Sequence, residues 1–326
     1  MTLLSDLQSL LGFSHVLTGA DADSYVQDWR RRYRGAALAV IRPGSTEEVA
    51  AAVKLCMHHG VPLVPQGGNT GLCGGATPDD SGRAVVLSTA RLTAVRNLDT
   101  ANDTITVEAG CILQAVQEAA AAADRLFPLS LAAEGSCTIG GNLATNAGGT
   151  QVLRYGNTRD LTLGLEVVTA EGEIWNGLRS LRKDNTGYDL RDLYIGSEGT
   201  LGIITAATLK LFPRPVASCT ALLTLDTIDH AVDVLARARS GFGAALTGFE
   251  LMSGACLQAV VRLFPQQRLP FEGASAESPW FALLELSDSE SEAHARDRFE
   301  AVLGDAIDAG PVSYTHLRAH ETGRNL

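Results

Sequence analysis

The chain has 326 residues, of which 45% are hydrophobic and 19% are charged, and its formal net charge at pH 7 is −11. This length provides for about two domains with a buried core. The negative charge argues against nucleic acid or an anionic membrane surface as a partner, and no apolar run in the sequence reaches transmembrane length.

The cysteines and the N-terminus indicate the compartment. Six cysteines are scattered along the chain without a CxxC pair, which in a chain this long favours reduced, mostly buried thiols over a disulfide framework or a zinc site. Residues 1–13 contain Asp6 and lack a basic leading region, so they do not resemble a signal peptide. We expect a cytoplasmic protein that begins with a helical segment over residues 1–35.

From Ala36 onward the sequence predicts alternating strands and helices. Ala37–Ile41 is expected to be a strand, and Ser45–Gly60 a helix because Ser45 and Glu48 have the spacing of a capping box. The short strand Val61–Val64 follows. Further along we expect strands at Ala84–Ser88 and Thr104–Glu108, a helix at Ile112–Asp124, a hairpin of Leu161–Thr169 with Glu173–Trp175, and a closing strand at Gly202–Leu211.

The pattern of predicted strands and helices changes after Pro213-Arg214-Pro215, and this proline-containing stretch is a plausible domain boundary. Strands and helices then alternate in the order β-α-β-α-β-α, which predicts an α+β domain with an open sheet and helices on one face. The expected elements are Ala221–Leu225, Ile228–Ala238, Ala245–Phe249, Met252–Leu263, Phe281–Leu286 and Ser291–Leu303.

Two glycine-rich stretches, Val64–Ala76 and Leu131–Thr150, carry the strongest chemical signal. Glycines let the backbone approach a ligand closely, and runs of free N–H groups form anion-binding concavities. Neither stretch matches the GxxxxGK[ST] or GxGxxG phosphate motifs. The pair therefore predicts a diphosphate held by backbone amides and neutral side chains, and the alternative for either stretch is a turn-rich loop.

Five motifs in fixed order identify a family. PQGGNTGL, GSCTIGGNLATNAGG, LRYG, LRKDNTGYDL and IGSEGTLGI resemble the FAD-binding domain of the vanillyl-alcohol-oxidase/p-cresol-methylhydroxylase (PCMH-type) superfamily, and within it most resemble the D-2-hydroxyglutarate and D-lactate dehydrogenases. The resemblance implies an α+β fold, with a two-part PCMH-type FAD-binding domain over residues 36–215. An incomplete α+β substrate cap would follow over residues 216–312.

The resemblance also implies which residues bind FAD. Branches that attach FAD covalently commonly use a His in the first loop, and Asn69 and its neighbours provide none, so non-covalent FAD is expected. Cys137 leaves two alternatives: it could form a thioether bond to the flavin, or it could be a small buried thiol without a role in attachment. The implied cofactor-binding residues are Pro65, Gln66, Gly67, Gly68, Asn69, Thr70, Gly71 and Leu72 around the pyrophosphate, Gly135, Ser136, Thr138, Gly140, Gly141, Ala144, Thr145, Asn146 and Gly148 along the rest of the cofactor, and Gly202 and Ile203 beside the adenine.

The motif LRKDNTGYDL combines a cation, amides and a phenol in a chain that has only three lysines. Lys183, Asn185 and Tyr188 are therefore candidates to face the isoalloxazine ring or a substrate carboxylate. The alternative interpretation is a hydrogen-bonded loop between two sheets.

Relatives of this kind oxidise a D-2-hydroxy acid by hydride transfer to the flavin. They use an Arg for the substrate, and a His and Glu cluster that binds a divalent metal such as zinc and supplies the base. None of the seven histidines matches that cluster, so no catalytic or metal-binding residue is assigned here. We expect the chain to stop before the catalytic half of the cap, and the metal to belong to the full-length parent.

The last fourteen residues, 313–326, contain fewer aliphatic residues than the preceding predicted helix and more Thr, Arg and Asn. His316 and His320 have i, i+4 spacing, but no Glu lies between them and no third ligand is near. The segment resembles translated adapter sequence. We expect an artefactual tail that packs poorly, and resequencing across codon 312 decides its origin.

Three functions stay open at this point. The first is the N-terminal part of an FAD-dependent D-2-hydroxy-acid dehydrogenase with a small 2-hydroxy acid as its substrate. The second is another PCMH-fold flavin reductase, such as the cell-wall enolpyruvyl reductase branch, and the third is a flavin-binding module without catalysis of its own. The reading frame downstream of Gly310 separates the first from the third. The electron acceptor and the oligomeric state are not fixed by the sequence.

The absence of the substrate-binding Arg and of the His and Glu cluster from this sequence gives a first prediction. Loaded with FAD and mixed anaerobically with D-lactate, D-2-hydroxyglutarate or glycolate, the chain as written should keep its oxidised flavin spectrum, because no base or substrate-orienting Arg is in reach. Stopped-flow absorbance measures this. Rapid bleaching by any of the three acids would show that the active site is complete.

Overall fold

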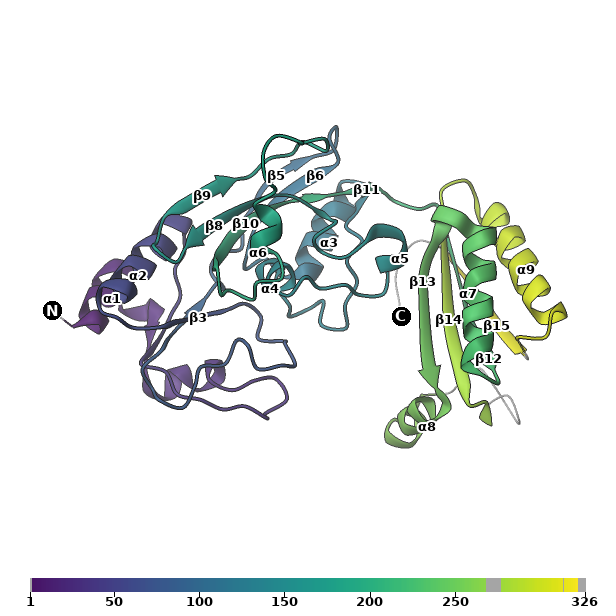
Figure 1. The fold of residues 1–326 in the computed structure, drawn as a ribbon, viewed down its shortest axis with the longest axis horizontal. Coiled ribbons are helices and arrows are strands. Elements are labelled where there is room, and N and C mark those ends of the chain that lie inside the picture. Colours follow the sequence, from purple (N-terminus) through teal and green to yellow (C-terminus); the bar gives the residue numbers. More distant parts are fainter. Residues whose placement is uncertain (1, 268–276, 313, 322–326) are drawn as a thin grey trace. The chain divides into compact units, whose positions relative to one another are not determined.

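The structure is a computed structural model that describes residues 2–267, 277–312 and 314–321. The chain forms two compact units (Figure 1). Unit 1 consists of Met1–Gly149 and Asn157–Pro213, and unit 2 consists of Thr150–Gly156 and Arg214–Leu326. Both units combine helices with sheets, which confirms the predicted α+β class. Among the described residues, no helix is both long and apolar enough to cross a bilayer.

The first sheet of unit 1 has the strand order β1-β2-β4-β3, and β2 and β3 both run parallel to β4. The Ser45 hydroxyl caps α2 by accepting from the Glu48 amide, while the Glu48 carboxylate reaches back to the Gly44 amide rather than to that of Ser45. The elements of this part are α1 (Leu3–Leu11), the 3₁₀ turns η1 (Phe13–His15) and η2 (Gly19–Tyr25), β1 (Val16–Leu17), β2 (Ala39–Ile41), α2 (Thr46–His58), β3 (Leu63–Gln66) and β4 (Val85–Ser88).

The second sheet of unit 1 is antiparallel with the order β5-β6-β10-β8-β9. Strand β5 was not predicted, because its sequence VRNLD is polar and its first three residues are exposed. The elements are β5 (Val95–Asp99), β6 (Thr104–Glu108), α3 (Leu113–Ala122), β7 (Arg125–Leu126), α4 (Ile139–Ala144), β8 (Thr162–Thr169), β9 (Ile174–Gly177), α6 (Arg191–Tyr194), β10 (Gly202–Lys210) and β11 (Phe212–Pro213), which pairs with β7.

A buried carboxylate joins helix α2 to the second sheet. Glu166 of β8 is 6% exposed, and its Oε1 accepts hydrogen bonds from the Thr46 hydroxyl at 2.6 Å and the Thr205 hydroxyl at 2.9 Å. The Arg96 guanidinium of β5 lies 3.1 Å from the same oxygen. Because an unpaired buried charge is costly, these partners fix the start of α2 against three strands.

Unit 2 contains an antiparallel sheet of order β13-β14-β12-β15, and helices α7 and α9 cover one of its faces (Figure 1). The rings of Phe242 and Phe299 stack at 5.3 Å between these two helices, which confirms the predicted one-sided arrangement. Its elements are α5 (Val152–Tyr155), β12 (Ala217–Leu225), α7 (Ile228–Phe242), η3 (Gly243–Ala245), β13 (Leu246–Ser253), α8 (Gly254–Leu263), β14 (Trp280–Asp288), α9 (Glu292–Asp308) and β15 (Tyr314–Glu321).

A short excursion interrupts the expected continuous domain 36–215. Residues 150–156, with α5, belong to unit 2 although they lie within the sequence of unit 1. The Arg154 Nη1 donates to the Ser287 carbonyl at 2.5 Å, and a Cβ atom on Gly248 would lie 3.1 Å from the Thr150 carbonyl oxygen. Sequence patterns could not show this, because the segment is too short to have a periodicity of its own.

Part of the tail forms a strand in the sheet of unit 2. Tyr314–Glu321 forms strand β15 and pairs with β12 over eight residues, from Tyr314 opposite Thr224 to Glu321 opposite Ala217. The free N–H and C=O groups along the edge of β12 offer hydrogen bonds to any extended backbone, whatever its side chains. The backbone of these residues is therefore paired, while the predictions of poor packing and of an artefactual origin stay predictions.

Candidate functional site

A cavity of about 620 Å³ lies within unit 1, inside the ~300–1,000 Å³ range of ligand pockets. Both glycine-rich stretches and the loop before β10 line it. The predicted cofactor-binding residues on its wall are Pro65, Gln66, Gly67, Gly68, Asn69, Thr70, Gly71, Leu72, Thr138, Gly140, Gly141, Ala144, Thr145, Gly202 and Ile203.

The cavity lies at the carboxyl ends of two parallel strands. Strand β3 ends at Gln66 and its neighbour β4 ends at Ser88, and the residues that follow, Gly67 and Thr89, both line the cavity. Ligands bind preferentially at this edge of parallel sheets. The short parallel part of the first sheet therefore determines where the first glycine loop begins.

The first loop has unused hydrogen-bond donors. Within the described part of the chain, the amides of residues 67–73 donate to no backbone carbonyl or side-chain acceptor. Asn69 has φ of +52°, and its side chain is held by a 2.8 Å hydrogen bond from Nδ2 to the Gln27 carbonyl. A loop with this many free amides is suited to a diphosphate.

The second stretch uses its donors internally. The Thr138 hydroxyl caps α4 by accepting a hydrogen bond from the Gly141 amide. The two amides between them are also used: Ile139 donates to the Cys111 carbonyl at 2.9 Å, and Gly140 donates to the Ala109 carbonyl at 2.7 Å. The expectation of free amides therefore holds for the first loop and not for the start of α4. The bonds to residues 109 and 111 instead anchor this wall to the five-stranded sheet.

Two buried polar atoms on the wall lack a well-formed hydrogen bond. Asn142 is 4% exposed and Thr89 is 5% exposed. Thr89 Oγ1 has no hydrogen-bond partner in the described structure, and Asn142 Nδ2 makes no hydrogen bond of good geometry, with only the Cys137 thiol as a polar neighbour. Because buried polar groups are normally satisfied, these atoms fit a ligand with hydrogen-bonding groups. With the free amides of the first loop, they make the residues present suitable for a dinucleotide.

Four predicted residues do not line the cavity. Gly135 and Gly148 lie outside its wall, as do Ser136 and Asn146. The Ser136 carbonyl packs behind Gly68, and Asn146, with φ of +48°, accepts from the Arg159 amide at 3.0 Å through Oδ1. Both shape the turn that carries the wall, so their small or amide character serves backbone geometry.

The motif of Lys183, Asn185 and Tyr188 does not face the cavity. These three residues are exposed, and Tyr188 is 94% exposed. The surrounding segment is tied down instead, by the Arg179–Asp184 ion pair at 2.9 Å. In unit 1 alone, the geometry favours the interpretation of a hydrogen-bonded loop over a ligand-binding role.

Sequence reasoning missed several wall residues. Thr89 has no signal except its place after a parallel strand, whereas Asn142 lies in the glycine-rich stretch and Glu198 in the IGSEGTLGI motif. Burial raises the pKa of the Cys137 thiol, and this outweighs the polar contact with Asn142 that lowers it. Cys137, considered from the sequence only as a possible thioether ligand, also lines the cavity, and the missed residues are Cys73, Gly75, Ala76, Thr89, Leu131, Asn142, Ala147, Glu198, Gly199 and Ile204.

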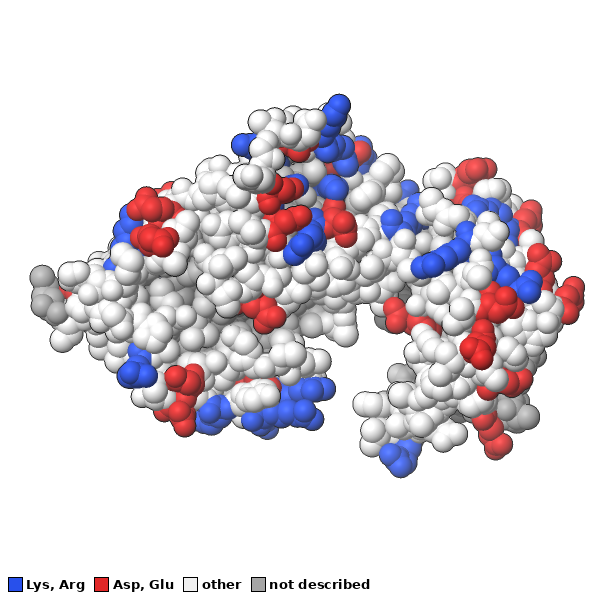
Figure 2. All heavy atoms as spheres, viewed as in Figure 1, with Lys and Arg blue, Asp and Glu red and all other residues white. Residues whose placement is uncertain are grey.

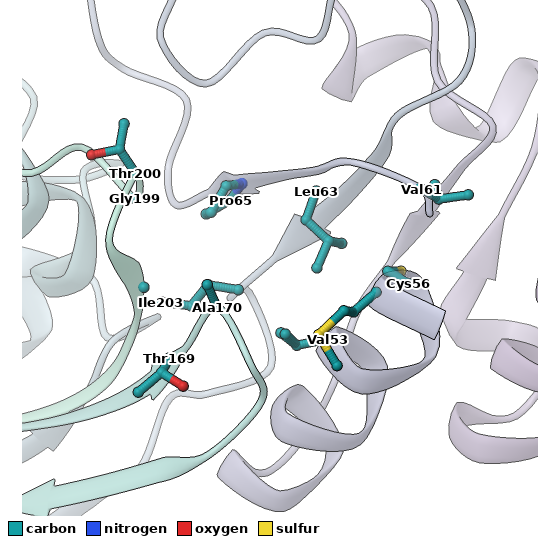
Figure 3. A pocket seen from close by; sticks show the side chains of 12 residues that line it. Val53, Cys56, Val61, Leu63, Pro65, Thr169, Ala170, Gly199, Thr200 and Ile203 are labelled. Atoms are coloured by element: carbon teal, nitrogen blue, oxygen red, sulfur yellow. The ribbon is translucent and has the colours of Figure 1, made fainter. Parts of the chain in front are cut away.

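A smaller pocket of about 220 Å³ adjoins the cavity (Figure 3), and it is lined mostly by apolar residues although about half of its surface is polar. Helix α2 contributes Val53 and Cys56, and strand β3 contributes Leu63. Burial raises the pKa of the Cys56 thiol to about 11, so this group is neutral. The residues that line both spaces are Pro65, Gly199, Gly202 and Ile203.

The site region carries little charge. Among the described residues, no three His, Cys, Asp or Glu side chains converge to hold a metal ion. On the face shown in Figure 2, acidic and basic side chains of the described residues are interspersed in short groups, so that face has no continuous basic surface of the kind that nucleic acid binding uses.

Comparison with known proteins identifies the cofactor of this fold. Residues 37–177 match the FAD binding domain family, and residues 214–324 match the C-terminal domain of FAD linked oxidases. The chain therefore contains an FAD binding domain followed by the C-terminal domain of FAD linked oxidases. The first match contains both glycine-rich stretches, so the predicted cofactor, FAD, is confirmed for this domain.

Several similar proteins are named for the same activity. The chain is 40% identical to the mitochondrial D-2-hydroxyglutarate dehydrogenase of Bos taurus over 296 residues, which covers 90% of this chain and 53% of the relative. It is 40% identical to the D-2-hydroxyglutarate dehydrogenase of Xanthomonas citri pv. viticola over 308 residues, or 94% of this chain and 63% of that protein. The chain thus spans about half to two thirds of the length of these relatives.

Solved structures confirm the fold predicted from the motifs. Alkyldihydroxyacetonephosphate synthase superposes with a TM-score of 0.78 at 20% identity, covering 95% of this chain and 58% of the other. A substrate-bound p-cresol methylhydroxylase superposes with a TM-score of 0.76 at 16% identity, covering 97% of this chain and 65% of the other. The chain therefore shares its fold with these PCMH-type structural neighbours.

Gly141 gives a test of the cavity wall. A Cβ atom on this residue meets only Thr138 Oγ1, at 3.4 Å, so Gly141→Val should leave the domain folded and place its methyl groups in the cavity. We expect FAD affinity to fall by at least about tenfold, as for ~1–3 kcal/mol of overpacking. Fluorescence titration measures affinity, and thermal unfolding measures the fold.

The matched control is Gly304→Val in helix α9. An added Cβ there has no neighbour within 4 Å, and Gly304 does not line the cavity.

By contrast, Gly68→Val should unfold the site, because its Cβ would lie 2.0 Å from the Ser136 carbonyl oxygen. Neither Gly68 nor Gly141 has a positive φ, so the added atoms rather than backbone strain produce these effects. Control-like FAD binding by Gly141→Val would remove this residue from the site.

Proposed function

We propose that this chain forms the FAD-binding part, and the first part of the substrate cap, of a dehydrogenase that oxidises D-2-hydroxyglutarate to the 2-oxo acid. The observation that carries the proposal is the 40% identity to D-2-hydroxyglutarate dehydrogenases over nine tenths of the chain. A D-lactate type substrate is the alternative within the same reaction class. Fold alone would not support a substrate.

The cavity residues have defined tasks in this proposal. The amides of residues 67–73 hold the diphosphate, and Asn142 and Thr89 donate to or accept from polar atoms of the cofactor. The smaller pocket beside Ile203 takes the adenine ring, in line with the position expected for Gly202 and Ile203. When bound, the flavin supplies the acceptor for a hydride, and the protein supplies its orientation and a wall that excludes water.

Attachment of FAD is proposed to be non-covalent. The first loop contains no His, and the buried Cys137 thiol has a raised pKa, so its nucleophilic thiolate form is scarce. These features support reversible binding, in which mass action sets the occupancy of the site.

Acid precipitation tests this directly. Purified, FAD-loaded protein is precipitated with acid and centrifuged, and the flavin absorbance of the supernatant and the pellet is compared. All of the FAD should appear in the supernatant, because unfolding destroys the cavity that holds it. Cys137→Ser should behave identically, and yellow colour that stays with the pellet would contradict non-covalent binding.

The substrate is tested in the cell that carries the gene. Deleting the gene should raise intracellular D-2-hydroxyglutarate, measured by chiral mass spectrometry, while D-lactate stays at its normal level. Complementation with the intact gene should restore the original level, and complementation with Gly68→Val should not. Accumulation of D-lactate alone would favour the alternative substrate.

A flavin-binding module without catalysis is the second candidate. It is favoured by the absence of His, Lys and Arg from the described wall of the cavity, since hydride abstraction from a hydroxy acid needs a base and a partner for the carboxylate. Anaerobic flavin reduction of the protein expressed from the intact gene distinguishes the two, because a module keeps its flavin oxidised with every hydroxy acid, whereas the dehydrogenase is bleached by its substrate.

The cytoplasmic location is also a proposal. All six cysteines are free, and four of them are buried. Free thiols in this number are typical of a reducing compartment, which supports but does not single out the cytoplasm. The electron acceptor is left open by these observations.

A further inference from the structure

Glu198 differs from every other residue of the cavity wall. It is the one Asp, Glu, Lys, Arg or His among the residues that line the 620 Å³ cavity, and the others are neutral or apolar. Its side chain is exposed, so it lies where the cavity opens. A carboxylate beside a site for a doubly charged diphosphate would be unfavourable unless it faces another part of the ligand.

The backbone at Glu198 is held in a conformation that favours glycine. Its φ is +51°, which costs a side-chain-bearing residue free energy that glycine would not incur. The Glu198 amide donates to the Ala144 carbonyl at 2.9 Å, at the end of α4. Retaining a long side chain at a strained position indicates a task for that side chain.

The carboxylate has no partner within the described protein. No hydrogen bond or ion pair involves its oxygens there, and Oε2 lies 3.0 Å from where a Cβ on Gly75 would be, so glycine at 75 leaves room beside it. An ionised carboxylate only accepts hydrogen bonds. Its ligand partner must therefore be a donor, and the hydroxyl groups of a sugar are donors that FAD offers next to its phosphates.

The position along the chain selects which sugar. Glu198 is followed by Gly199 and Thr200, both of which line the smaller pocket, and Gly199 lines both spaces. If adenine occupies that pocket, the ribose attached to it lies at the junction, beside residue 198. Carboxylates that accept from ribose hydroxyls are an established solution in other dinucleotide sites.

We propose that the Glu198 carboxylate accepts hydrogen bonds from the ribose hydroxyls of the adenosine half of FAD and thereby selects FAD over flavins that lack adenosine. This inference rests on the proposed FAD function. It assigns Glu198 to cofactor binding, as a specificity-determining residue that takes no part in the redox step. A 2′-phosphate at this position would be repelled by the same charge.

The test is a cycle of two cofactors and two proteins. Full-length wild-type chain and Glu198→Gln are titrated with FAD and with FAD that contains 2′-deoxyadenosine, and flavin fluorescence reports Kd. For wild type, the deoxy cofactor should bind about tenfold more weakly, the size expected for a charge-assisted hydrogen bond. Glu198→Gln should bind FAD about tenfold more weakly and show little further loss with the deoxy cofactor.

Two further variants separate binding from structure. Glu171→Gln, at the exposed turn between β8 and β9, is the matched control and should behave as wild type. Glu198→Gly should raise the melting temperature of the apoprotein, because glycine relieves the positive φ, while FAD affinity still falls. A lower melting temperature would show that Glu198 serves the fold instead.

The outcomes distinguish the two proposals. If Glu198→Gln binds FAD as tightly as wild type, or loses as much affinity as wild type on removal of the 2′-hydroxyl, the assignment of Glu198 is overturned and the FAD function stands. If wild type binds neither cofactor, the proposed function itself is wrong, and the assignment of Glu198 falls with it.

Discussion

The close approach of two backbones determines the shape of the site. A Cβ atom on Gly68 would lie 2.0 Å from the Ser136 carbonyl oxygen, and one on Gly67 would lie 2.4 Å from Thr138 Oγ1. Only hydrogen atoms fit between the two glycine-rich stretches at these points. At these points the first loop contacts the second stretch without side chains of its own, and its amides have no partner in the described protein.

That contact is stable only because the elements behind it are fixed. Gly140 packs against Ala109, where an added Cβ would lie 2.7 Å from the Ala109 Cβ, so the second stretch lies directly on the five-stranded sheet. On the other side, the Glu166 network joins that sheet to the start of α2. The charge on Glu166 is shielded from water, so losing any partner would expose the full desolvation cost. A polar network thus supports a nearly neutral cavity.

The sequence predicted most of the architecture because its signals were local. The capping pair Ser45 and Glu48, the strand Thr104–Glu108 and the hairpin of β8 with β9 each depend on residues near one another in the chain. Strand β5 pairs with the adjacent β6, but its polar sequence VRNLD shows no strand pattern, and the contribution of Thr89 depends on residues that are distant in sequence. The motif resemblance supplied the cofactor, which periodicity alone does not determine.

The candidate site residues also differ in whether local sequence was enough to predict their position on the cavity wall. Loop residues such as Asn69 and Thr70 line the cavity because the loop itself is its wall. Ser136 and Asn146 have the same chemical character but are directed into turns, and side-chain direction depends on φ and ψ rather than on residue type. Glu198 was within a quoted motif, yet its chemical meaning became visible only when the neutrality of its surroundings was known.

The path of the chain between the two units has a consequence for how the protein is made. The polypeptide leaves unit 1 at Thr150, returns at Asn157, and leaves again at Arg214, so neither unit is a continuous stretch of sequence. During synthesis, α5 leaves the ribosome before strand β13, on which it packs. Unit 1 must therefore fold while residues 150–156 have no partner to pack against. Cutting the gene at residue 214 would therefore not liberate an independent second unit, because the seven residues that cover part of β13 would remain with the first.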